Sequence, residues 1–201
     1  MIDQEKLTLL PTYNLLNLNK CFVMNITKFV ELSLGKWRSQ RSAHHLAFSY
    51  FEQVISTIDI EPLELDDPQV ISLCKSYKIA PQLANVPFKM SWEGESDWDE
   101  NEVVKGSTIL VPIPDPQEPS KGKLLREQGY AETIPAVGHY HFSSDGTFVL
   151  LTDYERATAE EKIWFVTPNL RCRVSLIKTS DGNGATTASF SSEIRSLSTN
   201  S

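Results

Sequence analysis

The spacing of apolar residues changes once along the chain, from a helical to an extended period. Over residues 26–34 the apolar side chains recur at intervals of three and four, which is typical of one helical face against a core. Gly35 is the residue type that commonly ends such a helix. Beyond it, β-branched and aromatic residues fall in short runs bounded by Gly, Pro, Asn or Asp. The pattern therefore predicts an N-terminal helix followed by strands.

These runs are frequent enough that we expect eight to ten strands. The candidates are residues 37–50, 51–63, 88–93, 107–112, 123–127, 131–142, 147–154, 162–166, 170–178 and 185–197. One short helix interrupts them after Asp67 and Pro68, an N-cap followed by proline at the first helical position. Because helices do not alternate with the strands, we expect an all-β antiparallel fold, a sandwich or a closed up-and-down barrel, and closure would remove exposed edges.

Length and composition point to one folded domain without nucleic acid or membrane partners. With 201 residues and 40% hydrophobic content the chain can bury one core, and its net charge of −7 disfavours phosphate binding. No apolar run is long enough to span a bilayer and no signal sequence is evident, so we expect neither membrane insertion nor secretion. Three scattered cysteines fit a reducing compartment. We interpret residues 1–23 as an N-terminal extension, 24–197 as the domain and 198–201 as a tail.

A short motif after the predicted helix adds a specific expectation about the barrel. Gly35-Lys36-Trp37 resembles the Gly-x-Trp signature of the lipocalin and fatty-acid-binding-protein superfamily, in which the tryptophan seals the closed end beneath an arginine of the last strand. Arg195 lies where that arginine is expected. The resemblance implies a calycin-like barrel in which Trp37 and Arg195 are structural, with the cation over the aromatic face. A ligand contact is the alternative for Arg195.

Three arginines have positions from which they could face the barrel interior. Arg41 shares a strand face with Trp37, so it points inward if the tryptophan does. Arg171, Arg173 and Ser175 share the polar face of a cleanly alternating strand. The usual arrangement of an antiparallel strand would place that polar face in solvent. The alternative is an anion-binding wall inside the barrel.

Two carboxylates and two tryptophans likewise have both a structural and a functional interpretation. Glu193 shares a face with Arg195, and a carboxylate turned inward would need a donor such as a ligand N–H. Glu161 opens a predicted strand, where it is either functional or one of a solvated acidic pair. Trp92 and Trp98 bracket an acidic turn and either pack in the core or form walls for a flat conjugated ligand.

Other kinds of chemistry find less support. Two of the four histidines, His139 and His141, could share a strand face, but no cysteine or carboxylate lies beside them at ligand spacing, so we expect no metal site. The chain has no Gly-x-Ser-x-Gly elbow, no phosphate-binding glycine loop and no Rossmann fingerprint. Hydrolase and dehydrogenase functions are therefore disfavoured.

Several segments together resemble the S/U-type phycobiliprotein lyases, the CpcS/CpeS family. The longest and most specific block is residues 35–48, GKWRSQRSAHHLAF. The other blocks are residues 91–94 (SWEG), 106–112 (GSTILVP), 122–127 (GKLLRE), 129–132 (GYAE), 164–165 (WF), 168–171 (PNLR) and 188–195 (ASFSSEIR). The resemblance spans about residues 24–196. It departs from the family at Ser42-Ala43, where threonine then serine is common, and in a lengthened loop over residues 112–121.

The resemblance implies a lyase that holds a linear tetrapyrrole noncovalently and helps to attach it by a thioether to a cysteine of an apo-phycobiliprotein subunit. It implies catalytic roles for Glu161, Glu193 and Arg171. The matching ligand-binding residues are Arg41, Trp92, Trp98, Ser175 and, less directly, Arg173. The bilin, phycocyanobilin or phycoerythrobilin, is substrate, and no permanently bound cofactor is expected.

Two other functions remain open at this point. The chain could be a passive carrier of a bilin or another hydrophobic ligand, or one subunit of a heterodimeric lyase. A homodimer is equally compatible with the sequence. The expected location is the cytoplasm of a cyanobacterium, or the plastid stroma of an alga.

Overall fold

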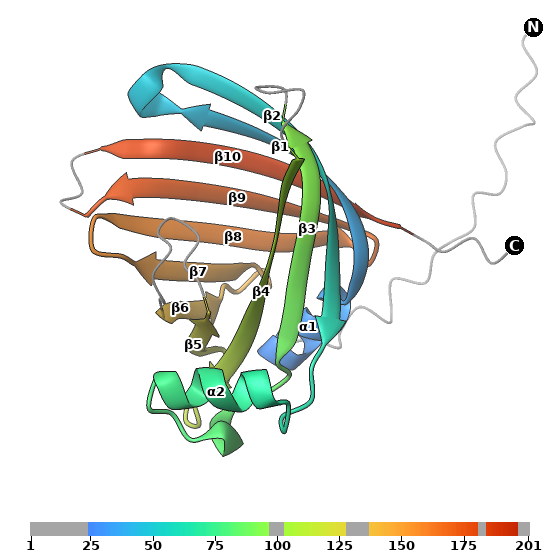
Figure 1. Cartoon of the computed structure of the whole chain (residues 1–201), viewed down its shortest axis with the longest axis vertical. Helices are drawn as coiled ribbons and strands as arrows, with labels where there is room; N and C mark the ends of the chain where they lie inside the picture. The colour runs from blue at the N-terminus through green and yellow to red at the C-terminus, as the bar shows by residue number, and fades with distance from the viewer. Residues whose placement is uncertain (1–23, 97–102, 128–136, 181–183, 197–201) are drawn as a thin grey trace, which may run out of the picture.

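The computed structural model describes residues 24–96, 103–127, 137–180 and 184–196 (Figure 1). The predicted extension (residues 1–23) and tail (residues 198–201) lie outside these ranges, as does Trp98. Within the described ranges, every helix and strand belongs to one barrel or packs against it.

Ten antiparallel strands form a closed barrel in the described residues, in the order β1-β10-β9-β8-β7-β6-β5-β4-β3-β2. They are β1 (Gly35–His45), β2 (Tyr50–Pro62), β3 (Phe88–Ser96), β4 (Val103–Pro114), β5 (Lys121–Arg126), β6 (Val137–Phe142), β7 (Phe148–Asp153), β8 (Ala157–Thr167), β9 (Leu170–Thr179) and β10 (Ala185–Arg195). Each strand pairs with its neighbours in sequence, and the first pairs with the last. Of the two architectures that the strand spacing allowed, a sandwich or a closed barrel, the structure has the up-and-down barrel that the resemblance also implied.

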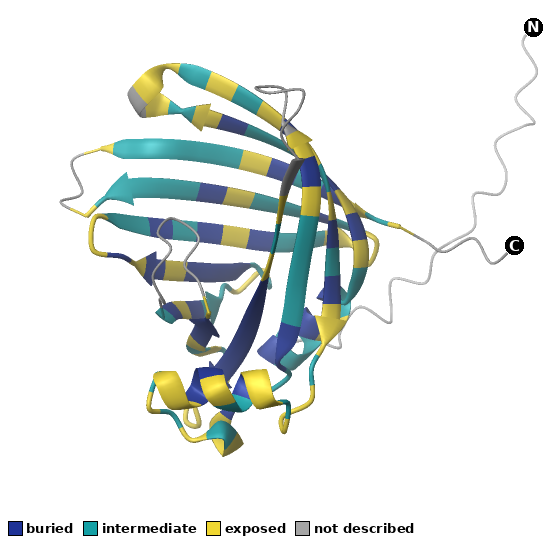
Figure 2. Ribbon diagram, in the orientation of Figure 1, coloured by how far each residue is buried: buried dark blue, intermediate teal, exposed yellow. Residues whose placement is uncertain are grey.

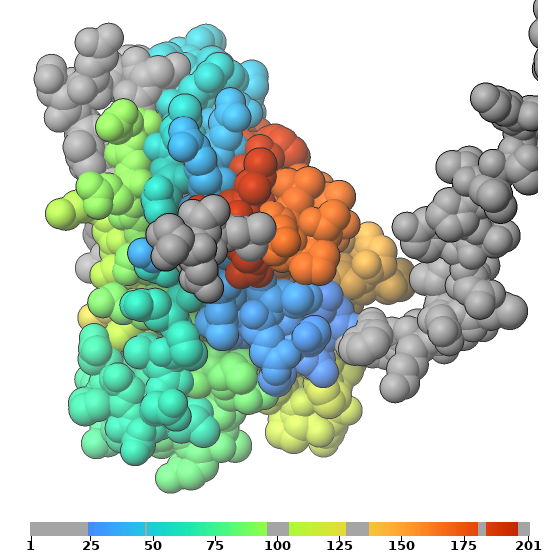
Figure 3. Space-filling model, turned by 90° about the vertical axis from the view of Figure 1, so that its right-hand side faces the viewer, coloured from blue at the N-terminus to red at the C-terminus, as the bar shows by residue number. Residues whose placement is uncertain are grey.

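Helix α1 (Ile26–Ser33) closes one end of the barrel. Asn25 caps it by accepting a hydrogen bond from the backbone N–H of Lys28 at 2.9 Å. The buried face of α1 enters the core, where Phe29 stacks on Phe148 with ring centroids 4.3 Å apart. Figure 3 shows α1, in blue, filling the surface beside the orange and red C-terminal strands. The chain leaves the helix through Gly35, whose φ of +100° is readily adopted only by glycine.

A second layer covers β4 and β5 from the outside. Helix α2 (Pro68–Ser76) begins at Asp67, whose carboxylate caps the N–H of Gln69 at 2.8 Å, as predicted. Its apolar face packs on the barrel together with residues near the 3-10 turn η3 (Pro81–Leu83). The cluster comprises Val70, Leu73, Cys74, Ala84, Ile109, Val111, Ile113 and Leu125. Figure 2 shows the buried face of α2 against the barrel and its exposed face outside. Both faces of residues 108–113 in β4 and 124–126 in β5 are consequently buried.

Some strands are longer than predicted. The apolar pattern placed the start of one strand at Lys162, whereas β8 begins at Ala157. The added half is polar, with buried Ala159 and Glu161 alternating with more accessible neighbours, so it carries no apolar signal. Glu161 therefore lies near the middle of β8 and not at its opening. A hairpin joins β1 and β2, with a 3-10 turn η2 (Leu46–Phe48) at its tip.

Candidate functional site

A pocket opens into the barrel from the end opposite Trp37 and α1. The cavity has a volume of about 170 Å³ and is open to solvent at its mouth. Its walls are interior positions of β1 to β3 on one side and of β5 and β8 to β10 on the other. The lining residues are Ser39, Arg41, Val54, Ser56, Ile58, Met90, Trp92, Gly94, Arg126, Glu161, Arg173, Ser189, Ser191 and Glu193.

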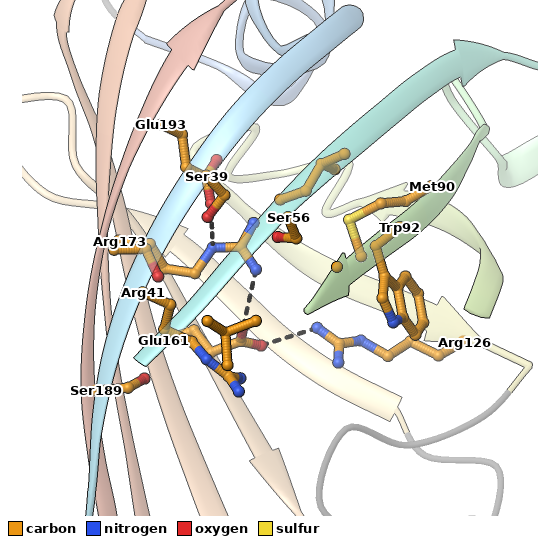
Figure 4. A pocket seen from close by; sticks show the side chains of 14 residues that line it. Ser39, Arg41, Ser56, Met90, Trp92, Arg126, Glu161, Arg173, Ser189 and Glu193 are labelled. Carbon is orange, nitrogen blue, oxygen red and sulfur yellow. Dashed lines mark hydrogen bonds and ion pairs between the residues drawn. The ribbon is translucent and has the colours of Figure 1, made fainter. Parts of the chain in front are cut away.

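Charges of alternating sign form a chain along one wall of this pocket (Figure 4). Arg126 Nη2 lies 2.9 Å from Glu161 Oε2, and Glu161 Oε1 lies 3.7 Å from Arg173 Nη1. Arg173 Nε lies 3.5 Å from Glu193 Oε1, and Arg171 Nε donates to the other oxygen of Glu193. The strand register explains the order, because Glu193 lies directly across from Arg171 on the neighbouring strand.

The two glutamates are deeply buried yet held in the ionised form. Only 4% of Glu161 and 1% of Glu193 is exposed. Burial alone would raise the pKa of Glu161, but Arg126 and Arg173 outweigh it and hold that pKa below its ordinary value. For Glu193 burial is likewise outweighed, by Arg173 and Arg171, and its pKa is also lowered. Two carboxylates therefore face the pocket as hydrogen-bond acceptors.

The closed end of the barrel is built around Trp37, which is fully buried. Its indole N–H donates to the carbonyl of Ser33 at 2.8 Å. The guanidinium of Arg195 lies 4.2 Å from the ring centroid and that of Arg171 lies 4.4 Å from it. Arg195 also donates to the carbonyl of Leu32 at 2.6 Å and to that of Leu34. Arg195 thus has the placement over the tryptophan that the sequence predicts.

Arg171 is buried behind the wall of the open pocket and is not exposed to a ligand there. It is 1% exposed, does not line the open pocket and contacts Glu193 and Trp37. Burial lowers its pKa to about 10, partly offset by Glu193, so the guanidinium stays charged at neutral pH. The predicted catalytic role of Arg171 remains a prediction, and from this position it would act through Glu193.

The polar face of β9 is turned inward, so its alternative placement in solvent is wrong. Arg173 lines the pocket, and Ser175 is 3% exposed and lies across from Glu161 on β8. The hydroxyl of Ser175 has no hydrogen-bond partner in the described part of the chain. Cys172 belongs to the opposite face of the same strand, paired in register with Trp164.

Arg41 and Trp92 border the opposite wall. Arg41 lines the pocket and lies 3.4 Å from Glu52, whose carboxylate also lies 3.1 Å from His45 Nε2. The ring of Trp92 lies flat against Gly106, where an added Cβ would come within 2.6 Å of the ring. Trp92 therefore forms part of the pocket wall. Its predicted companion Trp98 is outside the described residues.

Sequence reasoning missed Arg126, which pairs with Glu161 and lines the pocket. A signal was present, because Arg126 follows Leu124 at a spacing of two and so shares its inward face. The signal was obscured because the intervening residue, Leu125, is apolar and is buried under α2. The other pocket residues that were not singled out are small or apolar: Ser39, Val54, Ser56, Ile58, Met90, Gly94, Ser189 and Ser191.

In the described ranges, no group of three or more His, Cys, Asp or Glu side chains could hold a metal ion. None of the helices described is both long and apolar enough to cross a bilayer.

The fold and the pocket together define a class of protein. A closed antiparallel barrel, sealed at one end by a tryptophan and an arginine and with a pocket lined by aromatic and charged side chains, is a calycin-like barrel. A family model described as "CpeS-like protein" matches residues 25–196. The chain belongs to this family, the CpcS/CpeS chromophore lyases.

Individual relatives agree over most of the chain. Chromophore lyase CpcS/CpeS 3 of Trichodesmium erythraeum is 66% identical over 86% of this chain and 100% of its own length. A putative phycoerythrobilin lyase CpeS of Microchaete diplosiphon is 63% identical over 79% of this chain and 71% of its own. The S-type phycobiliprotein lyase CpeS from Guillardia theta superimposes with a TM-score of 0.77 and 52% identity, covering 87% of this chain and 94% of that structure.

Proposed function

We propose that this chain is a bilin lyase that binds a linear tetrapyrrole noncovalently in the barrel pocket and catalyses its thioether attachment to a cysteine of an apo-phycobiliprotein subunit. The family and the names of its members support the lyase activity. The observation that carries the mechanism is the pair of buried, ionised glutamates that faces the pocket.

A bilin matches the pocket in three respects. It is a flat conjugated molecule, and Trp92 and Met90 supply an apolar wall of suitable shape. Its pyrrole N–H groups are donors that need buried acceptors, which Glu161 and Glu193 supply. Its two propionates are anions, and arginines line the same cavity. Each part of the ligand thus has a partner of complementary chemistry.

The glutamates would also activate the bilin for addition. A carboxylate that accepts hydrogen bonds from pyrrole nitrogens stabilises their protonated, cationic form. The cationic pyrrole system in turn draws electron density from the A-ring ethylidene group. The cysteine thiolate of the acceptor protein then forms the carbon–sulfur bond at the ethylidene carbon, and the displaced electron pair takes up a proton at the neighbouring ring carbon. The lyase contributes electrostatic stabilisation and orientation, with no nucleophile of its own.

The described cysteines are poorly suited to holding the bilin covalently. Cys74 is completely buried on the inner face of α2, and burial raises the pKa of its thiol, which disfavours the reactive thiolate. Cys172 points away from the pocket on β9. Noncovalent binding is therefore expected, so denaturation of the lyase–bilin complex should release all of the pigment.

The test is a transfer assay with the full chain. Purified protein is incubated with phycocyanobilin or phycoerythrobilin and with separate apo-phycobiliprotein subunits, then denatured, and covalent pigment on each acceptor is measured by fluorescence. Pigment on an acceptor cysteine in excess of a lyase-free control is the expected result. Binding without transfer would contradict catalysis by this chain alone and leave a carrier or one subunit of a heterodimeric lyase.

A further inference from the structure

We propose that Arg126 is a further substrate-binding residue, whose guanidinium receives a carboxylate of the bound ligand. The inference rests on the proposed function, because it concerns the same pocket and the same tetrapyrrole. It adds a residue that contributes to binding only when the propionates of the ligand are free carboxylates and not esters.

The position of Arg126 is the first part of the argument. The side chain projects from the end of β5 into the barrel, is about nine-tenths buried and lines both the open pocket and a smaller cavity beneath it. Its Nη2 pairs with Glu161 at 2.9 Å. Its Nε is fully buried and has no hydrogen-bond partner in the described residues. A buried guanidinium N–H without an acceptor is costly, so a ligand acceptor at this place would remove the cost.

The charge balance of the wall is the second part. Arg126, Arg171 and Arg173 carry three positive charges, whereas Glu161 and Glu193 carry two negative ones. Within the described residues Arg126 has a single acidic partner, Glu161, in a poorly solvated place. A ligand carboxylate that enters the pocket would give its guanidinium a second anionic partner.

Arg126 is better placed for this carboxylate than its neighbours. Arg171 is enclosed by Glu193 and Trp37 and does not reach the open pocket. Arg173 lies between the two glutamates and is within ion-pair distance of both. Arg126 stands at the end of the chain of charges, with Glu161 on one side and the cavity on the other (Figure 4).

The barrel also holds the backbone of Arg126 in place. Its carbonyl accepts a hydrogen bond from the Tyr77 hydroxyl at 2.8 Å, and Tyr77 directly follows α2. The preceding residue, Leu125, is fully buried against the same helix. With its backbone held and its guanidinium paired with Glu161, the side chain loses less conformational freedom when a ligand binds.

The test compares the affinity of the full chain for a free bilin and for its dimethyl ester, measured by absorbance titration. Wild-type protein should prefer the diacid at least tenfold. Arg126→Gln should weaken diacid binding by about 10- to 100-fold, as expected for a charge-assisted hydrogen bond in a buried site. It should weaken ester binding less than diacid binding, because the ester keeps the pyrrole N–H groups that bind Glu161 but offers Arg126 no carboxylate. Arg126→Lys keeps the positive charge but loses the paired N–H donors of the guanidinium. Its affinity for the diacid should lie between those of wild type and Arg126→Gln.

The controls distinguish a failure of this inference from a failure of the proposed function. Arg38→Gln on the exposed outer face of β1 removes an arginine charge far from the pocket wall and should change neither affinity. Equal losses for diacid and ester in Arg126→Gln would overturn the inference and leave Arg126 as a structural partner of Glu161. If Arg126→Gln does not fold, Arg126→Lys is compared instead. A reduced preference for the diacid over the ester supports the inference, and an unchanged preference overturns it. Failure of the wild-type chain to bind either pigment would instead refute the proposed function.

Discussion

At the scale of single residues, the side of a strand on which a charge falls decides what it can do. Glu160 and Glu161 are adjacent on β8, but Glu160 pairs with Lys162 at 2.9 Å at the surface, while Glu161 enters the pocket between two arginines. Their side chains are 29% and 5% exposed. Surface pairs of the first kind contribute little, whereas a buried carboxylate with two cationic partners is costly to disturb. The two residues therefore make a matched pair for mutagenesis.

Glu161→Gln should lower the rate of bilin transfer by about 100-fold or more, because the neutral amide stabilises developing positive charge on the pyrroles far less than a carboxylate does. Glu160→Gln should leave the rate unchanged. The measurement is single-turnover transfer to an apo-subunit, monitored by fluorescence, with bilin affinity determined separately. Equal rates in the two variants would remove Glu161 from the mechanism.

The glutamates also predict a dependence of stability on pH. The pKa values of Glu161 and Glu193 are both lowered from 4.5 in the folded protein, so folding favours their ionised forms. Their contribution to stability is therefore fully present above pH 4.5 and is lost as the pH falls through the lowered folded pKa values. We expect the free energy of unfolding to decline below that pH, and less steeply in Glu161→Gln.

Urea denaturation at a series of pH values measures this decline. An identical acid profile in wild type and Glu161→Gln would show that the glutamate is not held ionised by its neighbours.

At the scale of elements, the sealed end of the barrel depends on contacts between the first and last strands of the domain. Arg195 is the last residue of β10, and Trp37 lies near the start of β1. The two strands pair so that these two residues lie directly across from each other. The same guanidinium donates to carbonyls at the end of α1, which lack partners within the helix. One side chain thus connects the last strand, the first strand and the helix.

Arg195→Met should lower the free energy of unfolding by about 2–4 kcal/mol, through the lost cation–π contact and the carbonyls left without donors. Bilin affinity of the folded protein should stay within about threefold of wild type, because Arg195 does not line the pocket. Arg38→Met on the outer face is the control for both quantities. A large loss of affinity with little loss of stability would instead favour a ligand contact for Arg195.

At the scale of the whole molecule, pocket and core share one barrel. Residues that line the pocket and residues of the main core, such as Ile58 and Trp92, lie on the same strands and in contact with one another. The pairing of β1 with β10 leaves no strand edge open in the described barrel. Ligand binding should therefore be coupled to the stability of the domain as a unit.

The chain should unfold in a single transition, and bilin at about 100 times its dissociation constant should raise the free energy of unfolding by about 2.7 kcal/mol. Differential scanning fluorimetry, read at wavelengths outside the bilin absorption, measures the shift. Glu161→Gln should show a smaller shift at equal pigment concentration. A pigment-independent midpoint, or two separate transitions, would contradict a ligand site within the single core.

The sequence by itself determined the class of fold, because the periods of apolar residues and the turn residues are local properties that survive without tertiary information. The resemblance of Gly35-Lys36-Trp37 to the lipocalin signature predicted the pairing of Trp37 with Arg195. Alternation along the strand placed Arg41 on the same face as Trp37. Alternation could not say which face of β9 meets solvent, because that depends on the other strands of the barrel.

Only the tertiary structure decided how the charges are divided among the arginines. It placed Arg171 behind Glu193, and it brought Arg126 to Glu161 from a strand 35 positions earlier in the chain. Local patterns identify residues that face inward, but the depth of each side chain and its ionic partner depend on barrel closure and on α2 covering β5. Those are long-range contacts, and the pKa values of the glutamates follow from them.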